Sequence, residues 1–149
     1  MTIEDHGGND AAELRRLIDD RVRAIRAKDA DATLAHYVPD VRSFDVIDPL
    51  RYAGRDGVAE RLRAWFSQFR EGPIGFELRD LEIVAGDRVA FCHSLDHVDA
   101  VTTGGNRIDV WWRATTCFRK LDGRWMVVHE HSSVPFDMES GRASLGLQP

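Results

Sequence analysis

Two histidines separated by one residue lie in the segment WMVVHEHSSVP, residues 125–135. If this segment is a strand, alternation places the rings of His129 and His131 on the same face. Two such imidazoles can bind a metal, transfer protons in a pocket, or form hydrogen bonds within a sheet. A metal site normally needs a third protein ligand, which would have to come from another strand. We therefore predict no bound metal and retain the other two interpretations.

A carboxylate and an arginine extend this candidate chemistry. Along residues 43–46, alternation places Asp45 on the face opposite Phe44. A carboxylate in an apolar cavity has a raised pKa that suits proton transfer, although neighbouring backbone or an arginine could equally satisfy it. Arg113 and Thr115 share one face of a later strand. An arginine in a pocket can hold a carboxylate or enolate oxygen.

The turn at residues 122–123 decides which of these side chains meet. A plain two-residue turn places His129 opposite Thr116, whereas a bulge at Gly123 places it beside Thr115. We favour the bulge, because Gly123 suits the left-handed position after a type I turn. The bulged register predicts one polar cluster that comprises Arg113, Thr115, His129, His131 and Ser133.

Further candidate ligand contacts are aromatic or imidazole side chains, namely Phe44, Tyr52, Trp65, His93 and Trp111. Trp111 and Trp112 are neighbours on a predicted strand and point to opposite faces. One of them is therefore expected to line the pocket or a core, and the other a subunit interface. No phosphate-binding loop or nucleophile elbow occurs in the sequence, so the predicted chemistry uses no cofactor.

The elements that must position these residues follow from periodicity. Apolar residues at helical spacing predict a first helix over residues 11–28, a short second helix that ends near Tyr37, and an aromatic-rich third helix that Asp56 caps. Glycine-containing turns then separate four predicted strands, at 75–85, 88–103, 107–121 and 124–133. Helices followed by hairpins indicate an α+β fold. Residues 1–10 are expected to form a flexible leader and residues 136–149 a loose tail.

Charge and composition limit the class of partner. The formal net charge is -5 and the sequence pI is about 5.6, which argues against nucleic-acid binding. No apolar stretch is long enough to span a membrane, and no secretory signal is evident. We therefore expect a cytoplasmic protein of one domain that binds a small molecule.

The ordered motifs AHYVPD, FDVIDP, YAG and RKLDGRWMVVHEHSSVP, placed among these helices and strands, resemble the SnoaL-like and ketosteroid-isomerase-like branch of the nuclear transport factor 2-like superfamily. The resemblance covers residues 11–135. It implies a cone, in which three N-terminal helices pack on a strongly curved antiparallel sheet that encloses an apolar pocket. It also implies a homodimer formed through the outer surface of the sheet.

The same resemblance implies roles for particular residues. The isomerases of this branch carry an Asp general base eight residues after a Tyr, and Asp45 follows Tyr37 at that spacing. They also use a Tyr of the first helix to bind an oxyanion, but Arg21 occupies that position here. The implied function is an isomerase, cyclase or hydrolase type of acid–base chemistry on a small apolar carbonyl compound, in which Asp45 or His131 moves a proton and Arg113 stabilises the oxygen. The alternative is a non-catalytic dimeric module for ligand binding or assembly.

Overall fold

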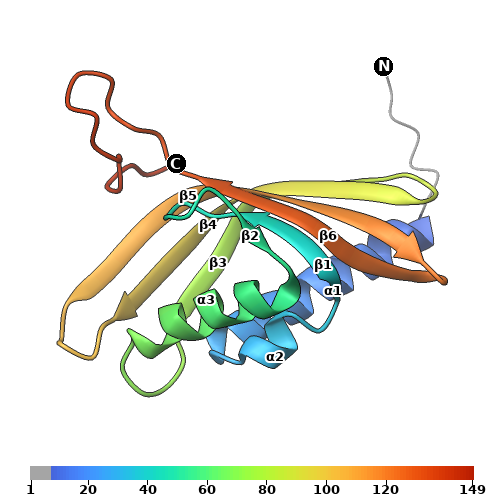
Figure 1. The fold of residues 1–149 in the computed structure, drawn as a ribbon, viewed down its shortest axis with the longest axis horizontal. Coiled ribbons are helices and arrows are strands. Elements are labelled where there is room, and N and C mark those ends of the chain that lie inside the picture. Colours follow the sequence, from blue (N-terminus) through green and yellow to red (C-terminus); the bar gives the residue numbers. More distant parts are fainter. Residues whose placement is uncertain (1–7) are drawn as a thin grey trace.

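Three helices lie on one side of a curved sheet in the computed structural model, which describes residues 8–149 (Figure 1). They are α1 (Gly8–Arg26), α2 (Ala30–Thr33) and α3 (Arg55–Ser67). We call the face of the sheet against which the helices pack the concave face, and the opposite face the outer face. This arrangement confirms the predicted α+β fold of helices packed on a curved sheet. None of the described helices is long and apolar enough to cross a membrane.

The sheet has six strands in the order β2-β1-β6-β5-β4-β3. They are β1 (Tyr37–Phe44), β2 (Tyr52–Ala53), β3 (Gly75–Ala85), β4 (Val89–Val101), β5 (Arg107–Leu121) and β6 (Arg124–Ser133). The predicted sheet was wholly antiparallel, whereas β1 and β6 pair in parallel and make the sheet mixed. No hairpin joins these two strands, because the whole meander separates them in sequence. Their relative direction is therefore free of the constraint that a tight turn imposes.

The first helix begins at Gly8, three residues before its predicted start. The carboxylate of Asp10 accepts hydrogen bonds from Lys120 Nζ at 2.8 Å and from Trp125 Nε1 at 3.0 Å. These contacts tie the first turn of α1 to the β5–β6 hairpin. Residues 8–10 are thus helical, and the remainder of the predicted leader lies outside the described residues.

Other predicted elements also differ in detail, and the second helix ends at Thr33 rather than near Tyr37, where β1 begins. The third helix has Gly54 rather than Asp56 at its N-cap, and Asp56 lies within its first turn. In the predicted tail, a turn brings Ser144 N to Pro135 O at 2.7 Å, and Phe136 forms an isolated bridge with Ala143.

The apolar core consists of two clusters under the concave face. The first includes Leu14, Val41, Phe118, Trp125 and Val127, and the second includes Ile25, Phe66, Phe69, Phe76 and Val98. Alternation along the strands supplies one face to each cluster, and the helices cover it.

Candidate functional site

Polar residues interrupt the apolar face of α1 and of β4 between the two core clusters. On α1, Arg21 lies between Ile18 of the first cluster and Ile25 of the second. On β4, Asp96 lies between Cys92 and Val98 on the same face. Buried charged groups cost free energy unless they are paired, so charges that are retained within a core are candidates for function.

Glu130 of β6 lies at the centre of a hydrogen-bonded network, which we call the Glu130 network. Its Oε2 accepts from Arg21 Nη2 at 3.1 Å and from the hydroxyl of Tyr37, while its Oε1 accepts from Ser43 Oγ at 2.9 Å. The guanidinium carbon of Arg21 also lies 5.5 Å from the centre of the Tyr37 ring. Donors from α1 and β1 therefore fix the carboxylate that β6 places on the concave face.

The electrostatics of this network keep the arginine charged. Burial disfavours the charge of Arg21, but the Tyr37 phenol and the Glu130 carboxylate more than offset this effect and raise its pKa. Burial raises the pKa of Tyr37 well above its usual value, and the partly opposing charge of Arg21 does not reverse the shift. Tyr37 therefore stays protonated and donates to Glu130, while Arg21 remains a permanent cation.

Asp96 is a buried titratable group of the concave face. Burial raises its pKa to about 6, although the Ser94 hydroxyl and the charge of Arg21 both act in the opposite direction. Ser94 Oγ donates to Asp96 Oδ1 at 2.6 Å. A carboxyl group with this pKa can both accept and donate a proton near neutral pH.

A second ion pair lies at the end of β1. Asp45, the predicted general base, follows the last residue of β1, and its Oδ2 lies 3.1 Å from Arg61 Nε of α3. Its other oxygen accepts a hydrogen bond from the backbone N–H of Val46 at 2.6 Å. The structure thus places Asp45 on the helix side of the sheet, with an arginine as its partner.

Solvent reaches both ion pairs. The side chains of Arg21 and Glu130 are 27% and 17% exposed, and those of Arg61 and Asp45 are 18% and 24% exposed. The buried Nε of Arg21 nevertheless has no hydrogen-bond partner, whereas the buried Nε of Arg61 contacts Asp45 as an ion pair without hydrogen-bond geometry. Arg21 therefore has an unused donor beside its own carboxylate, because Nη2 rather than Nε binds Glu130.

The register of β5 and β6 places the predicted histidine cluster on the outer face. Asp122 and Gly123 both have positive φ, 52° and 77°, and form a plain two-residue turn, so the predicted bulge at Gly123 is wrong. The bulge lies instead at Val128, since Phe118 pairs with Val127 and the next pair is formed by Cys117 and His129. The extra residue turns Glu130 toward the helices.

The five residues of the predicted cluster therefore share a face, but it is the outer one. His131 lies opposite Thr115 and Ser133 opposite Arg113, whose Nε donates to Ser133 Oγ at 3.1 Å. His129 Nδ1 lies 2.8 Å from the carbonyl oxygen of Arg42. A role for His131 and Arg113 on a pocket ligand required them to point toward the helices, and the Val128 bulge orients them away.

The other predicted ligand contacts are divided between the two faces. Phe44, His93 and Trp111 lie on the outer face, where Phe44 packs edge-on against His129, His93 pairs with Glu82, and Trp111 stacks on His97. Trp65 belongs to the second core cluster. It packs against Trp112 at 6.3 Å, so Trp112 is the inward member of its pair. Tyr52 packs against the first cluster and donates to Asp48 O at 3.0 Å.

Sequence reasoning missed Glu130 and Asp96, and it noted Arg21 only as a departure from the isomerase pattern. Asp96 could have been found, because it alternates with the buried residues Cys92 and Val98 of β4. Glu130 could not, since its orientation depends on a bulge that no glycine or proline marks.

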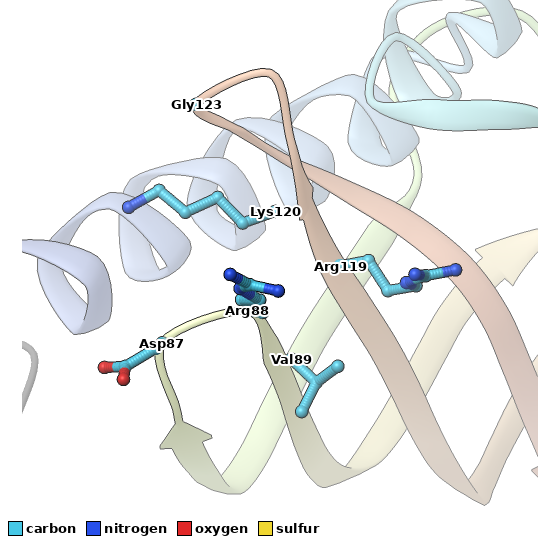
Figure 2. Close-up of a pocket in the computed structure, with 6 residues that line it drawn as sticks. All are labelled: Asp87, Arg88, Val89, Arg119, Lys120 and Gly123. Atoms are coloured by element: carbon cyan, nitrogen blue, oxygen red, sulfur yellow. The ribbon is translucent and has the colours of Figure 1, made fainter.

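A hollow of about 570 Å³ on the protein surface lies apart from this network (Figure 2). It is lined by Asp87, Arg88, Val89, Arg119, Lys120 and Gly123 at the turns of two hairpins. Lys120 contacts Asp10, and Arg21 lies further along α1 by roughly 16 Å at the helical rise. The hollow and the Glu130 network are therefore separate features. Within residues 8–149, no three His, Cys, Asp or Glu side chains are placed to hold a metal together.

Residues 14–137 match the SnoaL-like domain family. An NTF2-like protein of unknown function from Pseudomonas putida KT2440 is similar in structure, with a TM-score of 0.83 and 32% identity over 96% of this chain and 100% of that chain. A candidate dehydratase of the NTF2-like family from Streptomyces avermitilis has a TM-score of 0.72 and 15% identity, over 83% of this chain and 95% of its own. The association domain of the C. elegans kinase CaMKII has a TM-score of 0.64 and 16% identity, over 87% and 98%. The last two similarities establish the fold alone, and no curated protein matches the sequence.

Proposed function

Because this chain belongs to the SnoaL-like domain family, we propose that its concave face binds a small, mostly apolar carbonyl compound and moves a proton on it without a cofactor. The observation that carries this proposal is the Glu130 network, which fixes the charged Arg21 on the concave face near the titratable Asp96. Apolar core surrounds these groups, and solvent still reaches Arg21 and Glu130.

Arg21 is the proposed oxyanion-stabilising group. It occupies the position where isomerases of the ketosteroid-isomerase-like branch carry a tyrosine. Its guanidinium also has donors beyond the one that binds Glu130. A charged donor that is already fixed in place stabilises negative charge as it develops on a carbonyl oxygen.

Asp96 is the proposed general base and acid. Its ionised carboxylate takes a proton from the carbon beside the carbonyl, the electron pair of that C–H bond forms a C=C bond, and the carbonyl π pair moves to the oxygen to give an enolate beside Arg21. Protonated Asp96 then returns the proton to a carbon atom, which balances the reaction as an isomerisation or an exchange. A pKa of about 6 suits both steps near neutral pH.

The proton-transfer step can be tested without knowledge of the natural substrate. Solvent deuterium incorporation into a simple ketone such as 2-tetralone, followed by NMR in D₂O, reports abstraction directly. We expect the protein to accelerate exchange, and Asp96→Asn to reduce that acceleration about 100-fold or more. Asp45→Asn tests the base that the sequence analysis favoured, and Asp31→Asn, at an exposed ion pair with Arg63, is the matched control.

The enzymatic proposal is abandoned if the wild-type protein accelerates exchange of no ketone, or if Asp96→Asn and Asp45→Asn both retain full acceleration. Loss in Asp45→Asn alone would transfer the role of base to Asp45.

A second proposal concerns assembly: we propose that two copies associate through the outer face. Exposed apolar side chains lie on that face, including Val89 at 60% and Phe91 at 42% on β4 and Phe44 at 38% on β1. The similarity in fold to an association domain supports this proposal. A dimeric, non-catalytic module is thus the alternative function. The cytoplasmic location stays a prediction.

A further inference from the structure

We propose that His129 and His131 together bind one divalent transition-metal ion on the outer face of the sheet. The ion is of the class that accepts imidazole and water as ligands at the same time, such as Ni²⁺ or Cu²⁺. This site uses no residue of the Glu130 network and goes beyond the proposed function, so either can fail without the other.

The two imidazoles lie close together on the outer face. His129 and His131 of β6 stand opposite Cys117 and Thr115 of β5. Their ring centres are 6.3 Å apart, and the ring planes are inclined by 59°. With metal–nitrogen bonds of about 2 Å, two imidazoles that share one ion have ring centres no more than about 6.5 Å apart. The observed separation therefore allows a single ion to contact both rings.

A backbone contact sets the tautomer of His129. Its Nδ1 lies 2.8 Å from the carbonyl oxygen of Arg42, and that oxygen can only accept a hydrogen bond. Nδ1 therefore carries a proton, which leaves the lone pair of Nε2 for a metal ion. Histidines that bind metals characteristically donate their other ring N–H to a carbonyl or a carboxylate. The side chain of His131 is exposed, so its ring can rotate to present a nitrogen to the same ion.

The phenyl ring of Phe44 restrains both imidazoles. It packs edge-on against His129 with ring centres 4.8 Å apart, and against His131 with ring centres 5.4 Å apart. Phe44 also stands opposite His131 in the parallel pairing of β1 and β6. Side chains that are already held in place lose less conformational freedom when they bind a common ligand. The pair is therefore arranged to act as a chelate.

The number of protein ligands decides the class of ion. Within residues 8–149, no third His, Cys, Asp or Glu is placed with this pair. Burial raises the pKa of the Cys117 thiol opposite His129, so the thiol stays protonated and is a poor ligand. Structural zinc sites use four protein ligands, whereas Cu²⁺ and Ni²⁺ accept mixed nitrogen and oxygen ligands in tetragonal geometry. The requirement for a third protein ligand, on which the prediction of no metal rested, does not apply to such ions.

Calorimetric titration of the full chain with Ni²⁺, on protein purified without a histidine tag, tests this site. We expect His129→Ala and His131→Ala each to weaken binding about tenfold or more, because a single imidazole cannot form a chelate. His93→Ala is the matched control, since His93 lies on the same face two strands away and pairs with Glu82. It should leave the affinity unchanged. Mg²⁺, which prefers oxygen ligands, should not bind to this pair.

Urea unfolding of each variant distinguishes a lost ligand from a damaged fold. Weaker Ni²⁺ binding in both single variants, at unchanged stability, supports the chelate. The site is rejected if removal of both histidines leaves Ni²⁺ affinity unchanged, if only one of the two matters, or if His93→Ala weakens binding as much as His131→Ala. None of these results affects the proton-exchange assay with Asp96→Asn, which tests the proposed function separately.

Discussion

At the scale of single residues, Arg21 and Glu130 each compensate the charge of the other. Glu130→Gln keeps the size of the side chain and an oxygen for Ser43, but it leaves the charge of Arg21 without its partner. We expect a loss in the free energy of unfolding on the order of 2 kcal/mol, because an uncompensated charge in a partly buried site is destabilising. Chemical denaturation measures the loss, and Arg21→Met combined with Glu130→Gln should recover part of it. The pairing account is wrong if Glu130→Gln costs no more than Asp31→Asn, which breaks an exposed pair.

Asp96 makes stability depend on pH in an unusual direction. Its pKa is raised from 3.8 to about 6, so the folded chain binds this proton more tightly than the unfolded chain. Between these two values the unfolded state carries fewer protons, and stability falls as the pH rises, reaching its lower level above pH 6.

Asp96→Asn should remove this loss because asparagine does not ionise. The variant's free energy of unfolding, relative to wild type, should increase on the order of 1 kcal/mol between about pH 5 and pH 8. Urea unfolding at both pH values measures the change. A difference that is the same at both pH values would show that Asp96 does not titrate in this range.

At the scale of elements, two features position the strands relative to the helices. They are the Val128 bulge and the close approach of β3 to β4. The bulge determines which side chains of β6 meet the helices, as described above. At the start of β3, Gly75 lies opposite Asp99, and a Cβ atom on Gly75 would lie 2.6 Å from the Asp99 carbonyl oxygen. The residues beside it anchor α1, since Arg26 Nε donates to Phe76 O at 2.7 Å and Arg26 O accepts from Ile74 N at 2.9 Å.

Gly75→Ala should therefore destabilise the protein by about 1–3 kcal/mol, because backbone of two strands must shift to admit the methyl group. Thermal and urea unfolding measure the effect. Gly146→Ala is the control, since a Cβ atom there meets nothing within 4 Å. Equal stability of the two variants would mean that β3 moves away from β4 at little cost.

At the scale of the whole molecule, the curved sheet separates the surfaces of the two proposed functions. The helices lie against its concave face (Figure 1), where the candidate site is, and its outer face presents apolar side chains to solvent. Exposed apolar surface on a folded domain is one mark of a contact with another protein.

If two copies associate through the outer face, Phe91→Arg should convert a dimer to a monomer, because it places a charge within an apolar contact. Light scattering coupled to size-exclusion chromatography measures the mass. Leu50→Arg, at an equally apolar residue that is 96% exposed outside the strands, should leave the mass unchanged. A monomeric wild-type protein, or a dimeric Phe91→Arg variant, would exclude this interface.

The sequence by itself determined the α+β class and the bounds of β3, β5 and β6, which coincide with the predicted ranges. These features depend on local physics: period-two alternation, and turns rich in glycine. Local pattern also identified Asp45 as a residue on the face opposite Phe44, and the family resemblance drew attention to position 21. Neither pattern nor resemblance could supply their partners, since Glu130 and Arg61 are far from them in sequence.

Only the tertiary structure decided which side chains of β6 face the helices and the candidate site. The sequence analysis considered the turn at residues 122–123 as the source of a bulge, but the extra residue is Val128, inside the strand. A shift of one residue moves every following side chain to the other face. Packing of β6 between β1 and β5 determines that shift, and packing is a property of the assembled sheet. His129 and His131 consequently lie on the outer face, and Glu130 between them binds Arg21 on the concave face.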